Sequence, residues 1–432
     1  MDKTLERLER WCSAPGITFE NPEAEEAFKS RTKRMADAVL LKTPDRVPIT
    51  PTFGMFPALD NGFTCEEVFF DRNKAYTAWM KTLLDFKPDV YRLNIRPGSV
   101  WEIIDYKQIS LPGRGISPYS MFQFNEEEYA KGDEFYDAFL EDPSDFMMRV
   151  YLPRVCGALR PLGNLPPMRE TFSYYLGLPG MLMAFGDPDV AGAFETLGRA
   201  GAEARDWASF AREKTLEMHA LGFPTDAGAG SAAPFDAIGD FIRGTRGVML
   251  DMFQRPEKLI AAMEKLVPIC IAMGLRAKKG VNPFVTMPLH KGPEGFMSLE
   301  QYKTFYWPTF RKVMVGLIDE GLIPMPFFEG DYTSRLEVIK DIPRGKALYK
   351  FEKVDIHKAK EILGDTVCFR GNVPITLLCT GTPEQVKAYV KELIDVFGRD
   401  GGLWVDSDAI FDKAKHENVR AMVEFTKEYG ST

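Results

Sequence analysis

Carboxylates and a histidine stand where short apolar runs end, and they are the residues of this sequence best placed to do chemistry. Glu329 directly follows the run Leu322–Phe328, Asp408 lies just beyond Gly402–Val405, and His290 ends a third run. Carboxylates that converge on one opening can bind a divalent metal or exchange protons with a substrate. Histidine changes its charge near neutral pH. We therefore predict Glu329, His290 and Asp408 as catalytic residues.

Further polar and aromatic side chains follow other apolar runs and are predicted to bind the substrate. They are Phe53, Asn94, Arg96, Arg370 and Asn372. Phenylalanines around the opening would suit an apolar or aromatic substrate. Structural interpretations stay open: Asp408 could make a loop turn, His290 could be a hydrogen-bonded structural group, Arg370 could pair with a nearby acid, and Asn372 could hold the backbone.

The elements that position these residues are short apolar runs alternating with helical patterns. Each run is bounded by Gly, Pro or Asp, as buried parallel strands are. The alternation predicts a (β/α)8 TIM barrel, whose active site lies at the carboxyl ends of the strands. The runs are Arg46–Thr52, Asp89–Ile95, Phe223–Ser231, Asn282–His290, Leu322–Phe328, Lys346–Phe351, Thr366–Arg370 and Gly402–Val405.

Residues 98–220 do not fit one strand-helix unit and are predicted to form a long helical insertion on the barrel mouth. Residues 1–432 are accordingly interpreted as one elaborated domain. Helix ends can be identified elsewhere in the sequence. Ser298 with Gln301 predicts one helix start, Thr382 predicts another, and His416–Tyr429 has the pattern of a last amphipathic helix.

Composition excludes several classes of protein. The formal net charge is −8, with 45% hydrophobic and 27% charged residues, which is typical of a globular protein and argues against a nucleic-acid partner. Neither a membrane-spanning run nor a signal peptide is visible, so we expect a cytoplasmic protein. The six cysteines and four histidines form no CxxC pair, which argues against zinc fingers and a disulfide framework.

Several longer stretches resemble the uroporphyrinogen decarboxylase superfamily, which includes the corrinoid-dependent methyltransferases. The resemblance implies a (β/α)8 barrel, in agreement with the strand pattern, and a homodimer as the family expectation. The stretches are Lys42–Pro48, Pro234–Asp251, Phe296–Pro308, Asp355–Val373 and Glu417–Gly430.

Departures from the family patterns indicate the branch. The true decarboxylases carry an early arginine-rich segment and a late histidine, but here Thr52–Phe56 contains no arginine and the late position falls near Asp408. The methyltransferases hold zinc with a His-x-Cys pair, matched here by Phe327–Glu329, and with a late cysteine, matched at about Asp408. The resemblance therefore implies a site in which carboxylates have replaced both thiolates, with Glu329 and Asp408 as the metal ligands, closer to the methyltransferase branch.

Three hypotheses follow. The leading one is an O-demethylase-type methyltransferase that moves a methyl group from a small, aromatic methoxylated donor to the corrinoid of a partner protein, with zinc or a harder divalent ion at the carboxylates. The second is a carboxy-lyase acting on a tetrapyrrole or another organic acid. The third is a non-catalytic protein that binds a corrinoid or tetrapyrrole.

Overall fold

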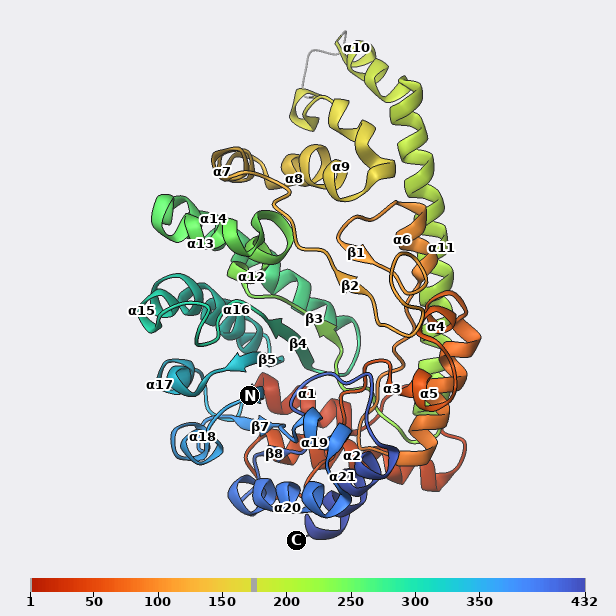
Figure 1. The fold of residues 1–432 in the computed structure, drawn as a ribbon, viewed down its shortest axis with the longest axis vertical. Coiled ribbons are helices and arrows are strands. Elements are labelled where there is room, and N and C mark those ends of the chain that lie inside the picture. The colour runs from red at the N-terminus through yellow and green to blue at the C-terminus, as the bar shows by residue number, and fades with distance from the viewer. Residues whose placement is uncertain (1, 172–176, 432) are drawn as a thin grey trace.

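A parallel sheet forms the centre of the structure, which is a computed structural model describing residues 2–171 and 177–431 (Figure 1). Its regular strands run in the order β3-β4-β5-β6-β7-β8, each parallel to its neighbour. They are β3 (Ala229–Gly230), β4 (Phe284–Leu289), β5 (Ile323–Asp331), β6 (Leu348–Lys353), β7 (Cys368–Arg370) and β8 (Leu403–Trp404).

Two extended segments close this sheet into a barrel. Ile49 forms a parallel bridge with Val405 just beyond β8. The Asp89 backbone N–H donates to the Ile49 carbonyl at 3.0 Å, and the Tyr91 N–H donates to the Pro224 carbonyl, also at 3.0 Å. The predicted (β/α)8 barrel is therefore confirmed.

The second predicted strand, Asp89–Ile95, is not a regular strand, however, and the first, Arg46–Thr52, is marked only by isolated bridges. Pro48 and Pro51 have no backbone N–H, so this segment cannot donate a full ladder of hydrogen bonds. The backbone carbonyl groups of this segment can still accept hydrogen bonds: the Val405 N–H donates to the Pro48 carbonyl at 2.8 Å.

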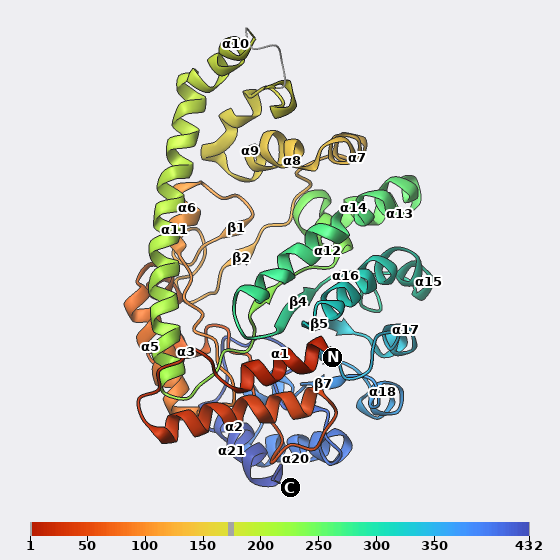
Figure 2. The same ribbon diagram turned by 180° about the vertical axis from the view of Figure 1, so that it is seen from behind.

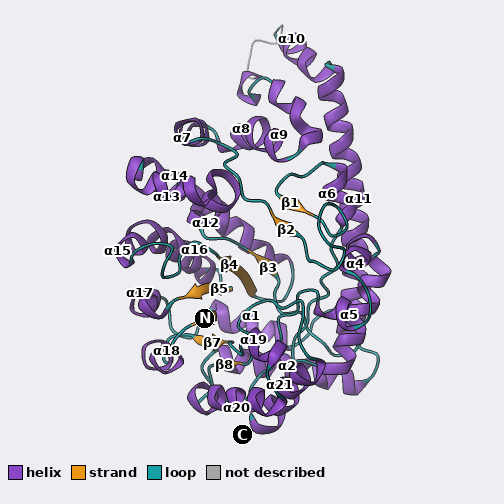
Figure 3. Ribbon diagram, in the orientation of Figure 1, coloured by secondary structure: helices purple, strands orange, loops and turns teal. Residues whose placement is uncertain are grey.

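Helices surround the barrel, and Figure 3 shows how strongly they outweigh the short strands. The helix starts predicted at Ser298 and Thr382 are confirmed, each with a capping box, and so is the last helix. The helices that follow β3 are α12 (Pro234–Ile238), α13 (Gly244–Gln254), α14 (Pro256–Gly274), α15 (Leu299–Gln301), α16 (Trp307–Asp319), α17 (Leu336–Ile339), α18 (Ile356–Leu363), α19 (Ile375–Thr380), α20 (Pro383–Leu393) and α21 (His416–Tyr429).

The first two helices of the chain cover the end of the barrel opposite the predicted site (Figure 2). Trp11 packs edge-on against Phe284 at the start of β4, with ring centroids 5.4 Å apart. Phe284 in turn contacts Trp404 of β8 at 5.2 Å. The first helices are α1 (Lys3–Cys12), α2 (Pro22–Val39), α3 (Phe56–Asp60), α4 (Cys65–Phe70) and α5 (Arg72–Phe86).

Residues 98–220 lie between the second and third barrel segments and are mostly helical, with one short antiparallel hairpin. The long helix α11 runs beside this whole region (Figures 1 and 2). The single-domain interpretation stays a prediction. The elements are α6 (Gly98–Ile103), β1 (Ile109–Ser110), β2 (Gln123–Phe124), α7 (Gly132–Glu141), α8 (Pro143–Phe146), α9 (Leu152–Val155), α10 (Leu178–Leu182) and α11 (Pro188–Ala220).

No helix within 2–171 or 177–431 has the length and apolar character needed to cross a membrane.

Gly222 ends α11 and returns the chain to the barrel, so its replacement should be costly. Its φ is +88°, and a Cβ there would lie 2.6 Å from the Ala24 carbonyl oxygen. We expect Gly222→Ala to lower the free energy of unfolding by about 2–4 kcal/mol, from left-handed strain and overpacking together. Gly16→Ala is the matched control, because Gly16 has φ +78° and nothing within 4 Å of a built Cβ. Equal losses in urea unfolding of the two variants would contradict the role of the close approach.

Candidate active site

His290 follows β4 and is held by an aspartate from the helical segment after β3. Its Nδ1 lies 2.5 Å from Asp240 Oδ2, and its Nε2 lies 3.7 Å from Glu329 Oε1 at the end of β5. Because an ionised carboxylate only accepts hydrogen bonds, Nδ1 carries the hydrogen in the Asp240 contact. This contact orients the imidazole so that its Nε2 points toward Glu329.

A second aspartate fixes the backbone under this histidine. Asp236 is 3% exposed and accepts hydrogen bonds from the backbone N–H groups of His290 and Lys291, both at 3.0 Å. The Tyr306 hydroxyl donates to the same carboxylate at 2.6 Å. Burial and the nearby Asp240 charge raise the pKa of Asp236. Asp236 thus positions the segment, while Asp240 orients the ring.

These surroundings favour the charged form of His290. Burial lowers its pKa, but the hydrogen bond with Asp240 and the charges of Asp240, Asp236 and Glu329 outweigh burial and raise the pKa to about 9. Burial also raises the pKa of Glu329, and the nearby Glu352 adds to this effect. The pair can therefore hold and release a proton beside a bound molecule.

An NMR titration of His290 tests this electrostatic description. We expect the ring to titrate near pH 9, and Asp240→Asn to lower that midpoint. Because the folded pKa exceeds the ordinary 6.5, the stabilisation from this charge is complete below pH 6.5 and is lost as the pH rises through about 9. His357, whose side chain is 70% exposed, is the internal control. Titration of His290 below its ordinary value would contradict the ion pair.

A large cavity with aromatic walls opens beside His290. It encloses about 580 Å³, which is within the usual range for a small organic molecule. The insertion supplies most of the wall, and His290, Asp240, Lys291, Glu126 and Arg96 contribute the polar groups. The aromatic lining residues are Trp101, Tyr106, Phe122, Phe124 and Phe241. We refer to this space as the aromatic cavity.

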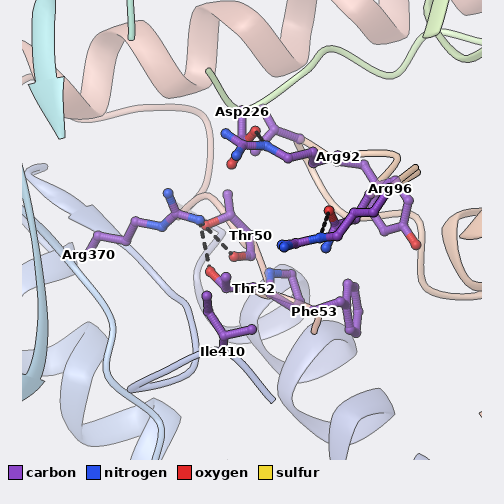
Figure 4. Close-up of a pocket in the computed structure, with 12 residues that line it drawn as sticks. Thr50, Thr52, Phe53, Arg92, Arg96, Asp226, Arg370 and Ile410 are labelled. Carbon is purple, nitrogen blue, oxygen red and sulfur yellow. Dashed lines mark hydrogen bonds and ion pairs between the residues drawn. The ribbon is translucent and has the colours of Figure 1, made fainter. Parts of the chain in front are cut away.

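A smaller cavity of about 110 Å³ lies at the mouth of the barrel (Figure 4), and we refer to it as the central cavity. A buried ion-pair cluster lies below it. Asp406 is fully buried and accepts from Lys350 Nζ and Arg370 Nε, both at 2.9 Å. It also accepts from the Thr52 hydroxyl at 2.6 Å. The two cations outweigh burial and lower the pKa of Asp406.

The sequence around this site matches a known family. Residues 216–429, which include His290, Glu329 and Asp408, match the family model uroporphyrinogen decarboxylase (URO-D). Residues 216–429 form a region of the uroporphyrinogen decarboxylase family. The matched region contains every regular strand of the barrel, so the predicted resemblance is confirmed.

Curated relatives of the superfamily align over parts of the chain. The uroporphyrinogen decarboxylase of Chlorobium phaeovibrioides is 38% identical over 79 residues, which are 17% of this chain and 22% of that protein. The enzyme of the same name from Chlorobaculum tepidum is 30% identical over 138 residues, covering 31% and 38%. The chain thus aligns with well under half the length of either relative.

A solved structure shares the fold over nearly the whole length. It is a methyltransferase from Methanosarcina mazei with a TM-score of 0.59 and 15% identity, covering 93% of this chain and 98% of that one. At this identity the match shows a common architecture. The structural match therefore also covers parts of the chain outside residues 216–429.

The residues predicted to bind the substrate fall into two groups. Phe53, Asn94, Arg96 and Arg370 all line the central cavity. Asn372 lines neither cavity. It is 4% exposed; its amide nitrogen donates to the Glu352 carbonyl at 3.3 Å, and its amide oxygen accepts from the Tyr389 hydroxyl at 3.1 Å. These contacts favour the structural role that the sequence left open for Asn372.

The two predicted metal ligands have different neighbours. Glu329 faces His290, whereas Asp408 Oδ1 accepts from the backbone N–H groups of Ile375 and Ala409 at 3.0 and 2.7 Å. Within 2–171 and 177–431, no group of three or more His, Cys, Asp or Glu side chains is arranged to hold a metal ion. The contacts of Asp408 fit the loop-turn alternative, and the metal site stays a prediction. We derive no step that depends on a metal ion bound at Glu329 or Asp408.

Several site residues were not predicted from the sequence. Asp236 and Asp240 are four residues apart in the segment after the third strand, and this spacing was an available signal. Lys350 is the charged residue in the buried part of β6, between Tyr349 and Phe351, which also could have drawn attention. The aromatic residues of the insertion gave no such signal, because aromatic side chains fill most protein cores.

Proposed function

We propose that this protein is a methyltransferase that removes the methyl group of a small aromatic methyl ether and passes it to the corrinoid of a partner protein. The observation that carries the proposal is His290, held by Asp240 and protonated to about pH 9, at the polar end of the aromatic cavity. The shared fold with a methyltransferase supports the class of reaction.

The proposed reaction requires that one proton is delivered to the aryl oxygen of the ether. The aryl ring lies among the aromatic walls, where stacking and edge contacts favour a flat ring. As the methyl–oxygen bond breaks, its electron pair stays on the aryl oxygen and the methyl group passes to reduced cobalt, the methyl acceptor. His290 Nε2–H donates its proton to that oxygen, so a neutral phenol leaves instead of a phenolate. Cobalt is formally oxidised from Co(I) to Co(III).

Glu329 and Asp240 support this proton transfer. Asp240 keeps the ring oriented and charged through its contact with Nδ1. Glu329, 3.7 Å from Nε2, favours the imidazolium and is placed to return a proton after each turnover. Lys291 Nζ lies 3.2 Å from Asp240 and 2.7 Å from Glu126, which holds Asp240 in place from its other side.

Incubation with a reduced corrinoid protein and a panel of aryl methyl ethers tests the proposal. We expect at least one ether to give methyl-cobalt and the matching phenol, as detected by the absorption spectrum and by chromatography. The corresponding ethyl ethers and the free phenols are the controls for the donor. Absence of methyl-cobalt with every donor would refute the proposed activity.

A carboxy-lyase is the second candidate, and a specific observation favours it. The central cavity is lined by the guanidinium groups of Arg92, Arg96 and Arg370, and cofactor-free decarboxylation benefits from cations around the reacting carboxylate. The curated relatives are named uroporphyrinogen decarboxylases. Release of carbon dioxide from a porphyrinogen, measured without any corrinoid, would support this candidate.

A further inference from the structure

One segment of the insertion lies against the barrel beside the proposed proton donor. Residues 122–130, which we call the strap, form part of the wall of the aromatic cavity. In the strap, Phe124 contacts Phe241 edge-on with ring centroids 6.0 Å apart, and the Tyr129 backbone N–H donates to the Ile242 carbonyl at 2.9 Å. The strap is therefore tied to the segment after β3, which also carries the carboxylate that orients the imidazole.

Glu126 connects the strap to the proposed proton donor. Its Oε1 accepts from the Thr245 backbone N–H at 2.6 Å, and its Oε2 accepts from Lys291 Nζ at 2.7 Å. The same ammonium group donates to the Thr245 hydroxyl oxygen at 2.7 Å and lies 3.2 Å from Asp240 Oδ1. The other carboxylate oxygen of Asp240 contacts His290 Nδ1 at 2.5 Å. A continuous chain of charged contacts thus runs from the insertion to the imidazole.

One lysine charge is shared between two carboxylates in this chain of contacts. Lys291 and Asp240 have only 9% and 7% of their side chains exposed, so their charges are weakly screened by water. Burial opposes the charges of Glu126 and Lys291, but their mutual hydrogen bond and the neighbouring charges outweigh it. They lower the pKa of Glu126 and raise that of Lys291. Both groups therefore stay charged while His290 titrates near pH 9.

Loss of the Glu126 charge would act on His290 in two ways. Lys291 would pair with Asp240 alone, so Asp240 would attract the imidazolium less strongly. One negative charge would also leave the surroundings of the ring, and both effects disfavour its charged form. The other titratable groups around the ring, which such a change leaves in place, are Asp236, Tyr306, Glu329, Glu352 and Arg96.

We propose that Glu126 is a positioning residue for His290, through which the insertion keeps the proton donor charged and oriented. The catalytic meaning of this role rests on the proposed function, but the effect on the imidazole does not. The insertion then does more than enclose a substrate, because the proton donor is fully prepared only while the strap lies in place. A purely structural Glu126 would hold the strap and leave the titration of His290 unchanged.

An NMR titration of His290, without donor or corrinoid, tests this proposal. We expect Glu126→Gln to lower the midpoint by about 0.5 pH unit or more, as the loss of one nearby charge in a partly exposed site should. Glu126→Asp keeps the charge on a shorter side chain and should give a midpoint between those of the wild type and Glu126→Gln. Glu127→Gln is the matched control, because it removes the same charge from an exposed position of the strap and should shift the midpoint much less.

A double-variant comparison tests the route through Lys291. Lys291→Met removes the shared cation and should raise the midpoint of His290. Glu126→Gln should then lower the midpoint much less in the Lys291→Met background than in the wild type. In the methyl-transfer assay, Glu126→Gln should move the alkaline fall of kcat to lower pH, while KM changes by less than about twofold because the aromatic walls remain.

The outcomes separate this proposal from the proposed function. Equal shifts in Glu126→Gln and Glu127→Gln, an equal fall in both Lys291 backgrounds, or an unchanged midpoint in folded Glu126→Gln would each overturn the role of Glu126. If Glu126→Gln does not fold, the shift in Glu126→Asp, compared with that in Glu127→Gln, decides in the same way. Titrations that follow these expectations without any methyl transfer would support the role of Glu126 and count against the proposed reaction alone.

Discussion

Replacing Asp406 with asparagine is expected to lower the free energy of unfolding by about 3–5 kcal/mol, because it leaves buried cations without their counter-charge. Within the described residues, Asp406 is the only ion-pair partner of Lys350 and of Arg370, and all three side chains are at most 5% exposed. The amide also cannot accept from every donor that now reaches the carboxylate. The loss should appear as a lower midpoint of urea unfolding.

Asp331→Asn is the matched control for this prediction. Asp331 pairs with Lys353 at 3.1 Å, but the lysine side chain is 75% exposed, so the expected loss is below about 1 kcal/mol. The pH dependence gives a further check. Because the pKa of Asp406 is lowered in the fold, its contribution is present above the ordinary value of 3.8 and is lost as the pH falls through the folded value. A small, equal effect for both variants would contradict the buried cluster.

Replacing His290 with glutamine is expected to lower kcat for methyl transfer by about 10²–10⁴-fold, which is the usual contribution of a positioned proton donor. Glutamine retains a polar side chain but cannot donate a proton to the leaving oxygen. The protonated ring is the active form, so the wild-type rate should be constant below the pKa of about 9 and fall as the pH rises through it. Asp240→Asn should move this fall to lower pH.

The leaving group separates a proton donor from a merely structural histidine. Donors that release a very acidic phenol, such as nitro-substituted aryl ethers, need less protonation and should lose little activity in His290→Gln. Donors with electron-rich rings should lose most of it. His357→Gln is the control, because that side chain is 70% exposed and lies 3.6 Å from Glu392. A uniform loss across all donors would contradict general acid catalysis by His290.

The barrel could be predicted from the sequence because its signals are local. Apolar runs bounded by Gly, Pro or Asp mark strands whether or not the partner strand is known, and the capping boxes at Ser298 and Thr382 depend on residues three positions apart. The exceptions were the first two strands: Pro48 and Pro51 remove hydrogen-bond donors from the first, and Asp89–Ile95 does not form a regular strand. The predicted helix after Ser298 is also interrupted, by the π-type segment Tyr302–Tyr306 ahead of Pro308.

The site was predicted in part, because its contacts join residues that are far apart in the chain. The position of His290 at a strand end was predicted, but its partner Asp240 lies 50 residues earlier, and no local pattern joins them. The comparison with zinc-binding relatives drew attention to Glu329 and Asp408 together. The structure instead places Glu329 beside His290, while backbone N–H groups hold Asp408. Chain direction and loop conformation decide such contacts, and residue type alone does not.

The most direct test of the central claim follows two carbon atoms of one donor. A methoxybenzoate carrying distinguishable isotopic labels at its methoxy and carboxyl carbons would be incubated with the protein and a reduced corrinoid protein. Methyl transfer predicts that the methoxy label appears on cobalt, that the carboxyl label stays on the resulting hydroxybenzoate, and that His290→Gln removes most of the transfer. Release of the carboxyl label as carbon dioxide, with the methoxy group intact, would contradict the account and identify the protein as a carboxy-lyase.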